Sequence, residues 1–418
     1  MAGVSIGLVG CGGMGHRHLH AYRALKAAGS HSCEVTAVCD PRSSAASAAA
    51  DLVETFQRSR PAVFSDHEEL IASRAAEALD IVTDPSVHHV VAVPALDEGI
   101  HVICEKPLGL TVRACRLMLD AAARSGAVLA TAENYRRDPP NRLARAVIER
   151  GLLGDIHLMQ QTNIGGDDAV IISPWRHVLE SGSIALDMGV HYTDLFAYFL
   201  GPLERVSGSS FIAEPVRVLA AGQQVGQGIE EVAPGVMRAT GDDSIVALYH
   251  AESGVPIQLA FIPSGPGRLV QRVVHGRRGT MSVPPDRSGG AVTVQIGDRT
   301  LAGAELRREL GGFGLEGVSV AFFGPAGTEY DLPFSAVDAA TIAIELDDFA
   351  RAIAERRAPE VDGLDGLLAV AGVWAVAEST LRSCEISIAE VAEGTHATAQ
   401  QAVDLAMGLL PETLGGTT

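Results

Sequence analysis

Cysteine is scarce in this chain, and its spacing suggests neither disulfides nor a zinc site. The six cysteines among 418 residues include no Cys-x-x-Cys pair. Small secreted domains are dense in cysteine, and structural zinc sites use closely spaced ligands. We therefore expect reduced thiols, with Cys11 acting as a small packed residue rather than as a nucleophile.

Basic charge is also scarce. The chain has 32 Lys and Arg against 51 Asp and Glu, which gives a net charge of −19, and no segment gathers enough basic residues to offset it. A protein that binds a nucleic-acid backbone needs a positive surface. We therefore expect no nucleic-acid partner.

Long apolar runs are missing as well. No segment reaches the roughly 18 uninterrupted apolar residues of a membrane span, and the first residues enter a strand pattern directly, without the stretches of a signal peptide. We expect a cytoplasmic protein with no membrane partner. A chain of 418 residues, 47% hydrophobic and 20% charged, should fold as about two globular domains.

The first 132 residues alternate short apolar runs with helical patterns, which is typical of parallel strands joined by crossover helices. Strands are expected at 4–9, 34–39, 63–64, 78–82, 101–104 and 127–132. Helices are expected at 14–28, 43–57, 86–98 and 111–124, with Pro94 kinking or shortening the third. The pattern predicts an α/β fold that begins with a doubly wound parallel sheet, the dinucleotide-binding domain, over residues 1–135.

From about residue 141 the pattern changes. A helix is expected at 142–150, a strand at 156–162 and a helix at 186–199. The stretch 206–332 alternates polar and apolar residues as an antiparallel sheet does, with a loop at 311–327. Helices return at 336–356 and 364–382, and one more is expected at 398–410. We predict a second, α+β domain over residues 136–418, which would bind substrate.

A glycine-rich loop follows the first predicted strand and opens the first helix. The segment Gly10-Cys11-Gly12-Gly13-Met14-Gly15 has the G-x-G-x-x-G spacing, in which glycines permit a tight turn and the approach of a pyrophosphate to backbone N–H groups. We predict that Gly10, Gly12, Gly13, Met14 and Gly15 contact a dinucleotide. The alternative is a turn with a purely structural role.

Asp40 ends the second predicted strand, where a carboxylate can accept hydrogen bonds from the adenosine ribose. This position favours NAD, because the carboxylate would repel the 2′-phosphate of NADP. Arg42 lies two residues later and could reach that phosphate instead. The sequence therefore predicts NAD as the cofactor, with NADP less favoured.

Polar residues follow the next strands. Thr83, Asp84 and His88 come after the fourth strand, and Glu105 and Lys106 come after the fifth, where a doubly wound sheet binds ligands at its carboxyl edge, so we predict that all five contact the cofactor. Lys106 could donate a hydrogen bond to a substrate hydroxyl. The alternatives are an ion pair between Lys106 and Glu105, and a hydrogen bond from His88 at the start of a helix.

In the second domain, Trp175 and Arg176 precede a helix that carries Asp187 and His191. Residues four apart share a helix face, so these two side chains could bind one substrate. His191 suits a general base for an alcohol, since an imidazole titrates near neutrality. The alternative is an aspartate that only orients a buried histidine.

The histidines at positions 16, 18 and 20 form no expected metal site. A spacing of two on a helix directs side chains apart, and no complete set of ligands occurs elsewhere in the sequence. We predict no metal.

Taken together, these motifs resemble the Gfo/Idh/MocA family, which includes glucose-fructose oxidoreductase and inositol dehydrogenases. The resemblance covers nearly the whole chain, and it implies a Rossmann domain followed by an α+β domain with a large, open, mainly antiparallel sheet. It implies a catalytic set of Lys106, Asp187 and His191, and homo-oligomers. By the same resemblance, Asn134 should contact the cofactor, and Arg136, Trp175 and Arg176 should bind substrate with the catalytic set. The motifs that carry it are the glycine loop, Asp40, the 83–88 turn, Glu105-Lys106-Pro107, Asn134-Tyr135-Arg136, the 151–156 connection, Trp175-Arg176, and Asp187 with Gly189 and His191.

Three functions are compatible with the sequence. The leading one is an NAD-dependent dehydrogenase that moves a hydride between nicotinamide and a hydroxyl-bearing carbon of a sugar, glycoside or inositol. The second keeps NAD bound and uses transient oxidation to cleave a glycoside without net redox change. The third is a non-enzymatic sensor of nucleotides, which the acid–base set of residues argues against.

Overall fold

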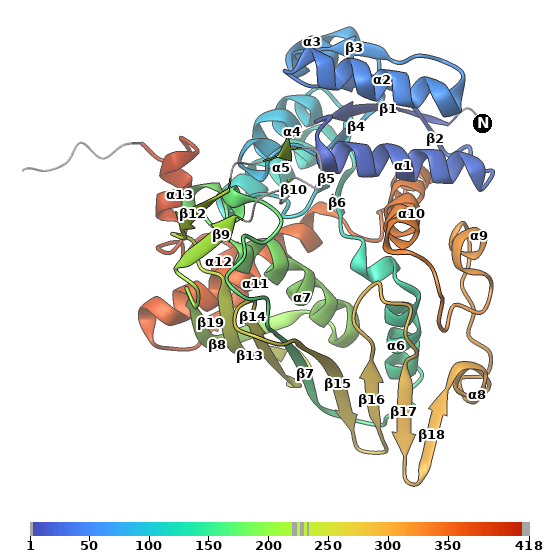
Figure 1. The fold of residues 1–418 in the computed structure, drawn as a ribbon, viewed down its shortest axis with the longest axis vertical. Coiled ribbons are helices and arrows are strands. Elements are labelled where there is room, and N and C mark those ends of the chain that lie inside the picture. Colours follow the sequence, from blue (N-terminus) through green and yellow to red (C-terminus); the bar gives the residue numbers. More distant parts are fainter. Residues whose placement is uncertain (1–2, 220–223, 226–229, 232–233, 412–418) are drawn as a thin grey trace, which may run out of the picture.

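The computed structural model describes residues 3–219, 224–225, 230–231 and 234–411. Its strands form two large sheets, and Figure 1 shows the first near the N-terminus and the second at the opposite end of the molecule. The two sheets confirm an α/β chain with a doubly wound parallel sheet followed by a mainly antiparallel one.

The N-terminal sheet has six parallel strands in the order β3-β2-β1-β4-β5-β6. The order reverses between β1 and β4, so a crevice opens there at the carboxyl edge, where doubly wound sheets bind ligands. The strands are β1 (Val4–Val9), β2 (Cys33–Cys39), β3 (Ala62–Phe64), β4 (Ala78–Ile81), β5 (His101–Glu105) and β6 (Leu129–Ala132), joined by α1 (Gly13–Ala27), α2 (Ser43–Gln57), α3 (His67–Ser73), α4 (His88–Asp97) and α5 (Val112–Ser125).

Two helices here differ from the sequence prediction. Helix α3 was not predicted, because seven residues are too few for a clear period; Asp66 starts it by accepting hydrogen bonds from the N–H groups of Glu68 and Glu69. Helix α4 begins at His88 rather than at residue 86, since Pro85–Val87 forms a 3-10 turn capped by Asp84. Pro94 lies within α4, which ends three residues later.

A C-terminal helix completes the first domain. Helix α10 (Phe334–Glu355) packs against α1, and Figure 1 shows the two side by side. Ile342, Leu346 and Phe349 of α10 are buried in the same core as Leu8 and Leu19. The domain boundary at residue 135 remains a prediction, but this helix from the second segment contributes to the first core.

The second sheet has nine strands in the order β18-β17-β16-β15-β7-β14-β13-β8-β19. Its neighbours are antiparallel except for β7 and β14, which are parallel. Helices α7 (Ile184–Leu200) and α11 (Gly363–Arg382) pack on one face. The strands are β7 (Ile156–Ile164), β8 (Leu203–Phe211), β13 (Ser244–Ala251), β14 (Pro256–Ile262), β15 (Leu269–Gly276), β16 (Thr280–Val283), β17 (Thr293–Ile296), β18 (Arg299–Ala302) and β19 (Ile386–Ser387), while β9 (Val216–Leu219) pairs with β12 (Gly235–Arg238) and β10 (Gln224–Val225) with β11 (Glu230–Glu231) outside it.

Short helices interrupt the region that was predicted as sheet and loop. Helix α8 (Gly303–Glu309) follows β18, and α9 (Ser319–Phe323) lies within the predicted loop 311–327. The predicted helix 398–410 contains only α13 (Gln401–Ala406), because Gly408 has a φ of +68° and ends the helical conformation. The remaining helices are α6 (Pro139–Glu149) and α12 (Ile388–Ala392).

Helix α11 is long and apolar enough, by length and composition alone, to cross a membrane. Its apolar window is 67% buried inside the protein, and the indole N–H of Trp374 donates to the carbonyl of Leu110 at 2.9 Å. These features are those of a core helix.

Candidate active site

A pocket of about 630 Å³ opens at the carboxyl edge of the parallel sheet, beneath the first half of α7. A second cavity of about 530 Å³ adjoins it and shares Gly12, Arg42, Thr83 and Asp84 with it. The glycine loop therefore borders both spaces, as expected for a ligand with two halves.

Two positions of the glycine loop require glycine. A Cβ atom on Gly15 would lie 2.1 Å from the carbonyl oxygen of Gly10, and Gly10 itself has a φ of +102°. Gly12, Gly13 and Met14 line the main pocket, whereas Gly10 lines the adjoining cavity. Gly15 lines neither, and it allows α1 to approach the sheet closely. Because the N-cap of α1 is Gly12, which has no side chain to cap the helix, the first N–H groups of α1 can bind a pyrophosphate.

The adjoining cavity has the features of an adenosine site. Val87 and Val90 line it and are 38% and 48% exposed, so two apolar surfaces face a slot suited to a flat base. The Asp40 carboxylate accepts the N–H of Cys11 at 2.8 Å and the N–H of Arg42 at 2.9 Å. These residues fit a dinucleotide. Burial raises the pKa of the Cys11 thiol to about 12, which agrees with a packed, unreactive residue.

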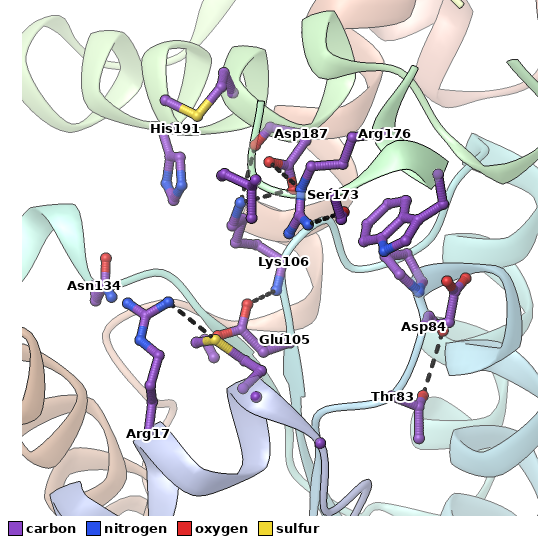
Figure 2. Close-up of a pocket in the computed structure, with 18 of the residues that line it drawn as sticks. Arg17, Thr83, Asp84, Glu105, Lys106, Asn134, Ser173, Arg176, Asp187 and His191 are labelled. Atoms are coloured by element: carbon purple, nitrogen blue, oxygen red, sulfur yellow. Dashed lines mark hydrogen bonds and ion pairs between the residues drawn. The ribbon is translucent and has the colours of Figure 1, made fainter. Parts of the chain in front are cut away.

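Lys106 and Asp187 meet at the base of the main pocket. The Lys106 ammonium donates to the Asp187 carbonyl and to its Oδ1, each at 3.0 Å, while the Arg176 Nε donates to Oδ2 at 2.9 Å. Burial alone would raise the pKa of Asp187, but the charges of Lys106 and Arg176 outweigh it and hold that pKa well below its usual range. Asp187 is therefore a fixed anion that orients two cations (Figure 2).

Behind Lys106, a buried histidine joins two strand ends. His18 Nδ1 lies 2.9 Å from an Asp80 carboxylate oxygen, and its Nε2 lies 3.3 Å from Glu105 Oε1. The other oxygen of Glu105 accepts the N–H of Lys106 at 2.9 Å. This chain of contacts fixes the backbone from which Lys106 projects. Within the described ranges, no three His, Cys, Asp or Glu side chains gather as metal ligands do.

His191 is held by a carboxylate and an aromatic ring. Its Nδ1 lies 2.7 Å from Glu133 Oε2, and its ring stacks on Tyr135 with centroids 3.9 Å apart and planes at 2°. Burial, together with the charge of Lys106, lowers the pKa of His191 well below its usual range, so the imidazole is neutral near pH 7.

The protonation of Glu133 decides whether His191 can accept a proton. Burial raises the pKa of Glu133 to about 7. When Glu133 is ionised it accepts the Nδ1–H, which leaves a lone pair on Nε2 for the substrate. When Glu133 is protonated it donates to Nδ1, and Nε2 then carries the hydrogen. Nε2 is therefore free to accept a proton when Glu133 is ionised, above about pH 7, and carries a hydrogen when Glu133 is protonated.

We expect Glu133→Gln to lower kcat/KM for alcohol oxidation by at least about tenfold and to remove the rise in activity near pH 7, because an amide cannot select the histidine tautomer by ionising. The measurement is kcat/KM against pH for both proteins. Glu77→Gln, at an exposed position whose carboxylate binds Ser5, is the matched control. A variant profile that still rises near pH 7 would assign the titration to another group.

Most predicted site residues lie together around the main pocket. Its lining includes Arg42, Thr83, Asp84, Glu105, Lys106, Asn134, Trp175, Arg176, Asp187 and His191, with the glycine loop at one end. Asn134 also offers a buried Oδ1 that has no hydrogen-bond partner among the described residues.

Two predicted residues do not reach the pocket. His88 is buried with its Nδ1 3.1 Å from the Pro107 carbonyl and its Nε2 3.3 Å from the Thr83 carbonyl, so it joins two turns instead of contacting a cofactor. Arg136 is closed in an ion pair with Asp194, with its Nε 2.7 Å from Oδ2, and it points away from the predicted substrate site. His88 was predicted from its place after the fourth strand and Arg136 from the family resemblance, whereas both side chains bind partners inside the fold.

The sequence interpretation missed three charged residues of the site: Arg17 and Arg287, which line the main pocket, and Glu133, which does not line it but binds His191. Glu133 precedes the Asn134-Tyr135-Arg136 motif directly, so a carboxylate at the end of the sixth strand was a usable signal. Arg17 lies one turn after the glycine loop on α1. Arg287 comes from the loop between β16 and β17, and nothing in its local sequence distinguishes it.

Comparisons with known proteins agree with this geometry. Residues 4–133 match the model of the oxidoreductase family with an NAD-binding Rossmann fold, and residues 141–282 match the GFO/IDH/MocA C-terminal domain. Levoglucosan dehydrogenase from Pseudarthrobacter phenanthrenivorans is 28% identical over 294 residues, which cover 67% of this chain and 73% of that protein. Inositol 2-dehydrogenase 2 from Saccharopolyspora erythraea is 27% identical over 284 residues, which cover 68% and 74%.

The fold is shared with solved structures. Levoglucosan dehydrogenase in complex with NADH and levoglucosan superposes with a TM-score of 0.73 at 23% identity, covering 92% of this chain and 99% of that one. At this identity the similarity establishes the fold, while the pocket residues must carry the argument about chemistry.

Proposed function

The chain belongs to the GFO/IDH/MocA family of NAD-dependent oxidoreductases, and from that membership we propose that it oxidises a hydroxyl-bearing carbon of a sugar, glycoside or inositol, or reduces the matching ketone. One observation carries the proposal: the Lys106 ammonium and the free nitrogen of the Glu133-bound His191 face the same pocket, next to the dinucleotide cradle.

Each group has a distinct part in the proposed reaction. His191 Nε2 takes the proton of the substrate hydroxyl, while Lys106, held by Asp187, donates a hydrogen bond to the same oxygen. Both oxygens of Asp187 are engaged, so Asp187 positions Lys106 and is not itself the base. NAD, when bound, supplies the nicotinamide carbon that accepts the hydride.

Asp40 sets the cofactor preference in this proposal. We expect Asp40→Ser to raise the KM for NAD by about tenfold and to raise the ratio of NADP to NAD efficiency by at least about tenfold, since a hydrogen bond to a charged group contributes roughly 1.5–3 kcal/mol. Initial rates with both cofactors measure this, with Asp51→Ser on exposed α2 as the control. An unchanged ratio would mean that Arg42 or the backbone sets the preference.

A panel of sugars, glycosides and inositols, each assayed with NAD and NADP, tests the function itself. Growth of the reduced-nicotinamide absorbance with any of them supports the dehydrogenase. Glycoside cleavage without that absorbance would replace it by the redox-neutral reaction, and no turnover of any compound would overturn the proposal.

We also propose that the protein forms homo-oligomers through the open face of the nine-stranded sheet. Val246, Leu248 and Leu269 lie on the face that α7 and α11 do not cover, and they are 43%, 38% and 51% exposed. Such a patch is typical of an interface. Sedimentation of the wild type and of Leu248→Glu tests this, and a wild-type monomer would contradict it.

A further inference from the structure

We propose that one wall of the main pocket binds an anionic group, a carboxylate or a phosphate, carried by the substrate. The wall consists of Arg17 from α1 and Arg287 from the loop between β16 and β17, both of which line the pocket. This inference rests on the proposed function and adds a substrate class to it: sugar acids or sugar phosphates rather than neutral sugars.

The side of the wall that lines the pocket is positively charged. Arg17 and Arg287 share one carboxylate, that of Asp338, which accepts from Arg17 Nε at 2.6 Å and from Arg287 Nη1 at 3.0 Å. Arg17 also binds this carboxylate through Nη2, so both guanidinium groups are fixed by the same side chain. The chain as a whole has a net charge of −19, so two arginines that line one wall of a pocket are a local departure from its acidic character, and they suit an anionic ligand.

The neighbouring carboxylates lie outside the pocket lining. Asp286 is bound by Arg272, with both pairs of atoms 2.8 Å apart. Asp138 accepts the backbone N–H of Arg287 at 2.6 Å and the hydroxyl of Tyr330 at 2.7 Å. None of Asp138, Asp286 and Asp338 lines the pocket, whereas both arginines do.

Arg287 is held rigidly and retains donor capacity. Its guanidinium carbon lies 4.9 Å from the ring centroids of both Tyr135 and Phe334. Among the described residues, Nη2 reaches only the Tyr135 hydroxyl, at 3.3 Å, so this nitrogen can still donate to a ligand, whereas the unpaired Nε is buried away from solvent. A guanidinium that is fixed in place and incompletely paired is preorganised for a planar or tetrahedral oxyanion.

The backbone of Arg287 is also unusual. Its φ is +58°, a left-handed conformation that costs a non-glycine residue of order 1 kcal/mol. Four of the other described non-glycine residues in this conformation, Arg58, Arg74, Arg356 and Ser383, end helices, where it is common. Arg287 ends no helix, and strain of this kind is concentrated at ligand sites.

The position of the wall matches the substrate end of the pocket. Figure 2 shows Arg17 on the side of Asn134 and His191, away from Thr83 and Asp84, which border the adenosine cavity. Tyr135 contacts both the Arg287 guanidinium, at 4.9 Å, and the His191 ring, at 3.9 Å. These contacts place the Arg287 guanidinium carbon within about 9 Å of the centre of the His191 ring, a length that a sugar with one terminal acid group can span.

Titration calorimetry of the NADH-loaded enzyme tests the proposal with D-glucose, D-glucuronate and D-glucose 6-phosphate as probes. We expect at least one anionic probe to bind at least about tenfold more tightly than D-glucose, and that preference to weaken with added salt, since charge attraction is screened. The two anions distinguish a carboxylate site from a phosphate site. Equal or undetectable binding of the anionic and neutral probes would overturn the proposal.

Arg287→Gln and Arg17→Gln should each abolish most of the preference while leaving the affinity for NADH within about twofold; Arg60→Gln, at an exposed pair with Asp51, is the matched control. Arg287→Lys keeps the positive charge and should retain part of the preference, which distinguishes a loss of the anion site from a misfolded variant. A loss of NADH affinity in place of anion preference would assign the wall to the cofactor and refute the proposal. If no sugar reduces NAD but the anion preference persists, the proposed function fails and the wall stands.

Discussion

His191→Ala is expected to lower kcat/KM for alcohol oxidation by between about 10² and 10⁴, the range that a positioned general base contributes. The reason lies in the geometry: Nδ1 is bound to Glu133 and the ring is fixed on Tyr135, so Nε2 is the atom left to accept the hydroxyl proton. The affinity for NAD should stay within about twofold, because His191 belongs to α7 and the dinucleotide cradle to the parallel sheet.

The measurement pairs steady-state kinetics with calorimetric binding of NAD. His31→Ala is the matched control, since His31 lies exposed in the turn between α1 and β2. A His191→Ala enzyme that keeps its kcat/KM would remove His191 from the reaction. A variant that loses NAD binding instead would mean that the histidine supports the cofactor and that the division of roles between the domains is wrong.

The sequence was sufficient for the parts of the site that form locally. The glycine loop, Asp40 and Lys106 each follow a strand of the parallel sheet, and topology brings carboxyl ends of parallel strands to one edge. Asp187 and His191 both lie on α7, four residues apart. In these cases the spacing along the chain already determines the spacing in space.

The contacts that the sequence could not supply join distant segments. Glu133 reaches His191 across 58 residues, and Arg287 reaches Asp338 across 51. Arg136 and His88 show the converse, because their local motifs suggested a ligand while Asp194 and the Pro107 carbonyl bind them inside the fold. Which partner a polar side chain takes depends on packing, and no periodicity encodes it.

The same distinction applies to the fold. The bounds of strongly periodic segments such as α10 were predicted within a few residues, but the packing of α10 against α1 was not predicted. Ile342 and Phe349 are buried at that contact, and only the tertiary packing determines which of several apolar faces they pack against. Elements below about eight residues, such as α3 and α9, carry too few turns for a period to show.

Lys106→Met is expected to lower kcat by about 10³ while changing the KM for the sugar much less, because the hydrogen bond to the reacting oxygen gains strength as negative charge develops on it. Lys26 and Lys106 are the only lysines in the sequence, against 30 arginines. An ammonium is a compact point charge, whereas a guanidinium is a broad fork, so the use of lysine at this position indicates a need for a small donor. Lys106→Arg should therefore be nearly as inactive as Lys106→Met.

The substitution also removes a buried partner of Asp187, which should lower the free energy of unfolding by about 3 kcal/mol, the cost of leaving a buried charge partly unpaired. Because the pKa of Asp187 is depressed in the folded protein, its contribution to stability is present above the pKa of an unfolded aspartate and is lost as the pH falls through the folded value. Lys106→Met raises that folded pKa, so the variant should lose less stability than wild type on acidification.

Lys106→Met combined with Asp187→Asn separates stability from catalysis. The double variant should regain much of the lost stability, since no uncompensated anion remains, yet stay as inactive as Lys106→Met. Denaturant unfolding at pH 7 and pH 3, below the pKa of an unfolded aspartate, and single-turnover kinetics measure the two effects, with Lys26→Met at the end of α1 as the control. Recovery of turnover in the double variant would show that Lys106 acts only by balancing Asp187 and makes no contact with the reacting hydroxyl.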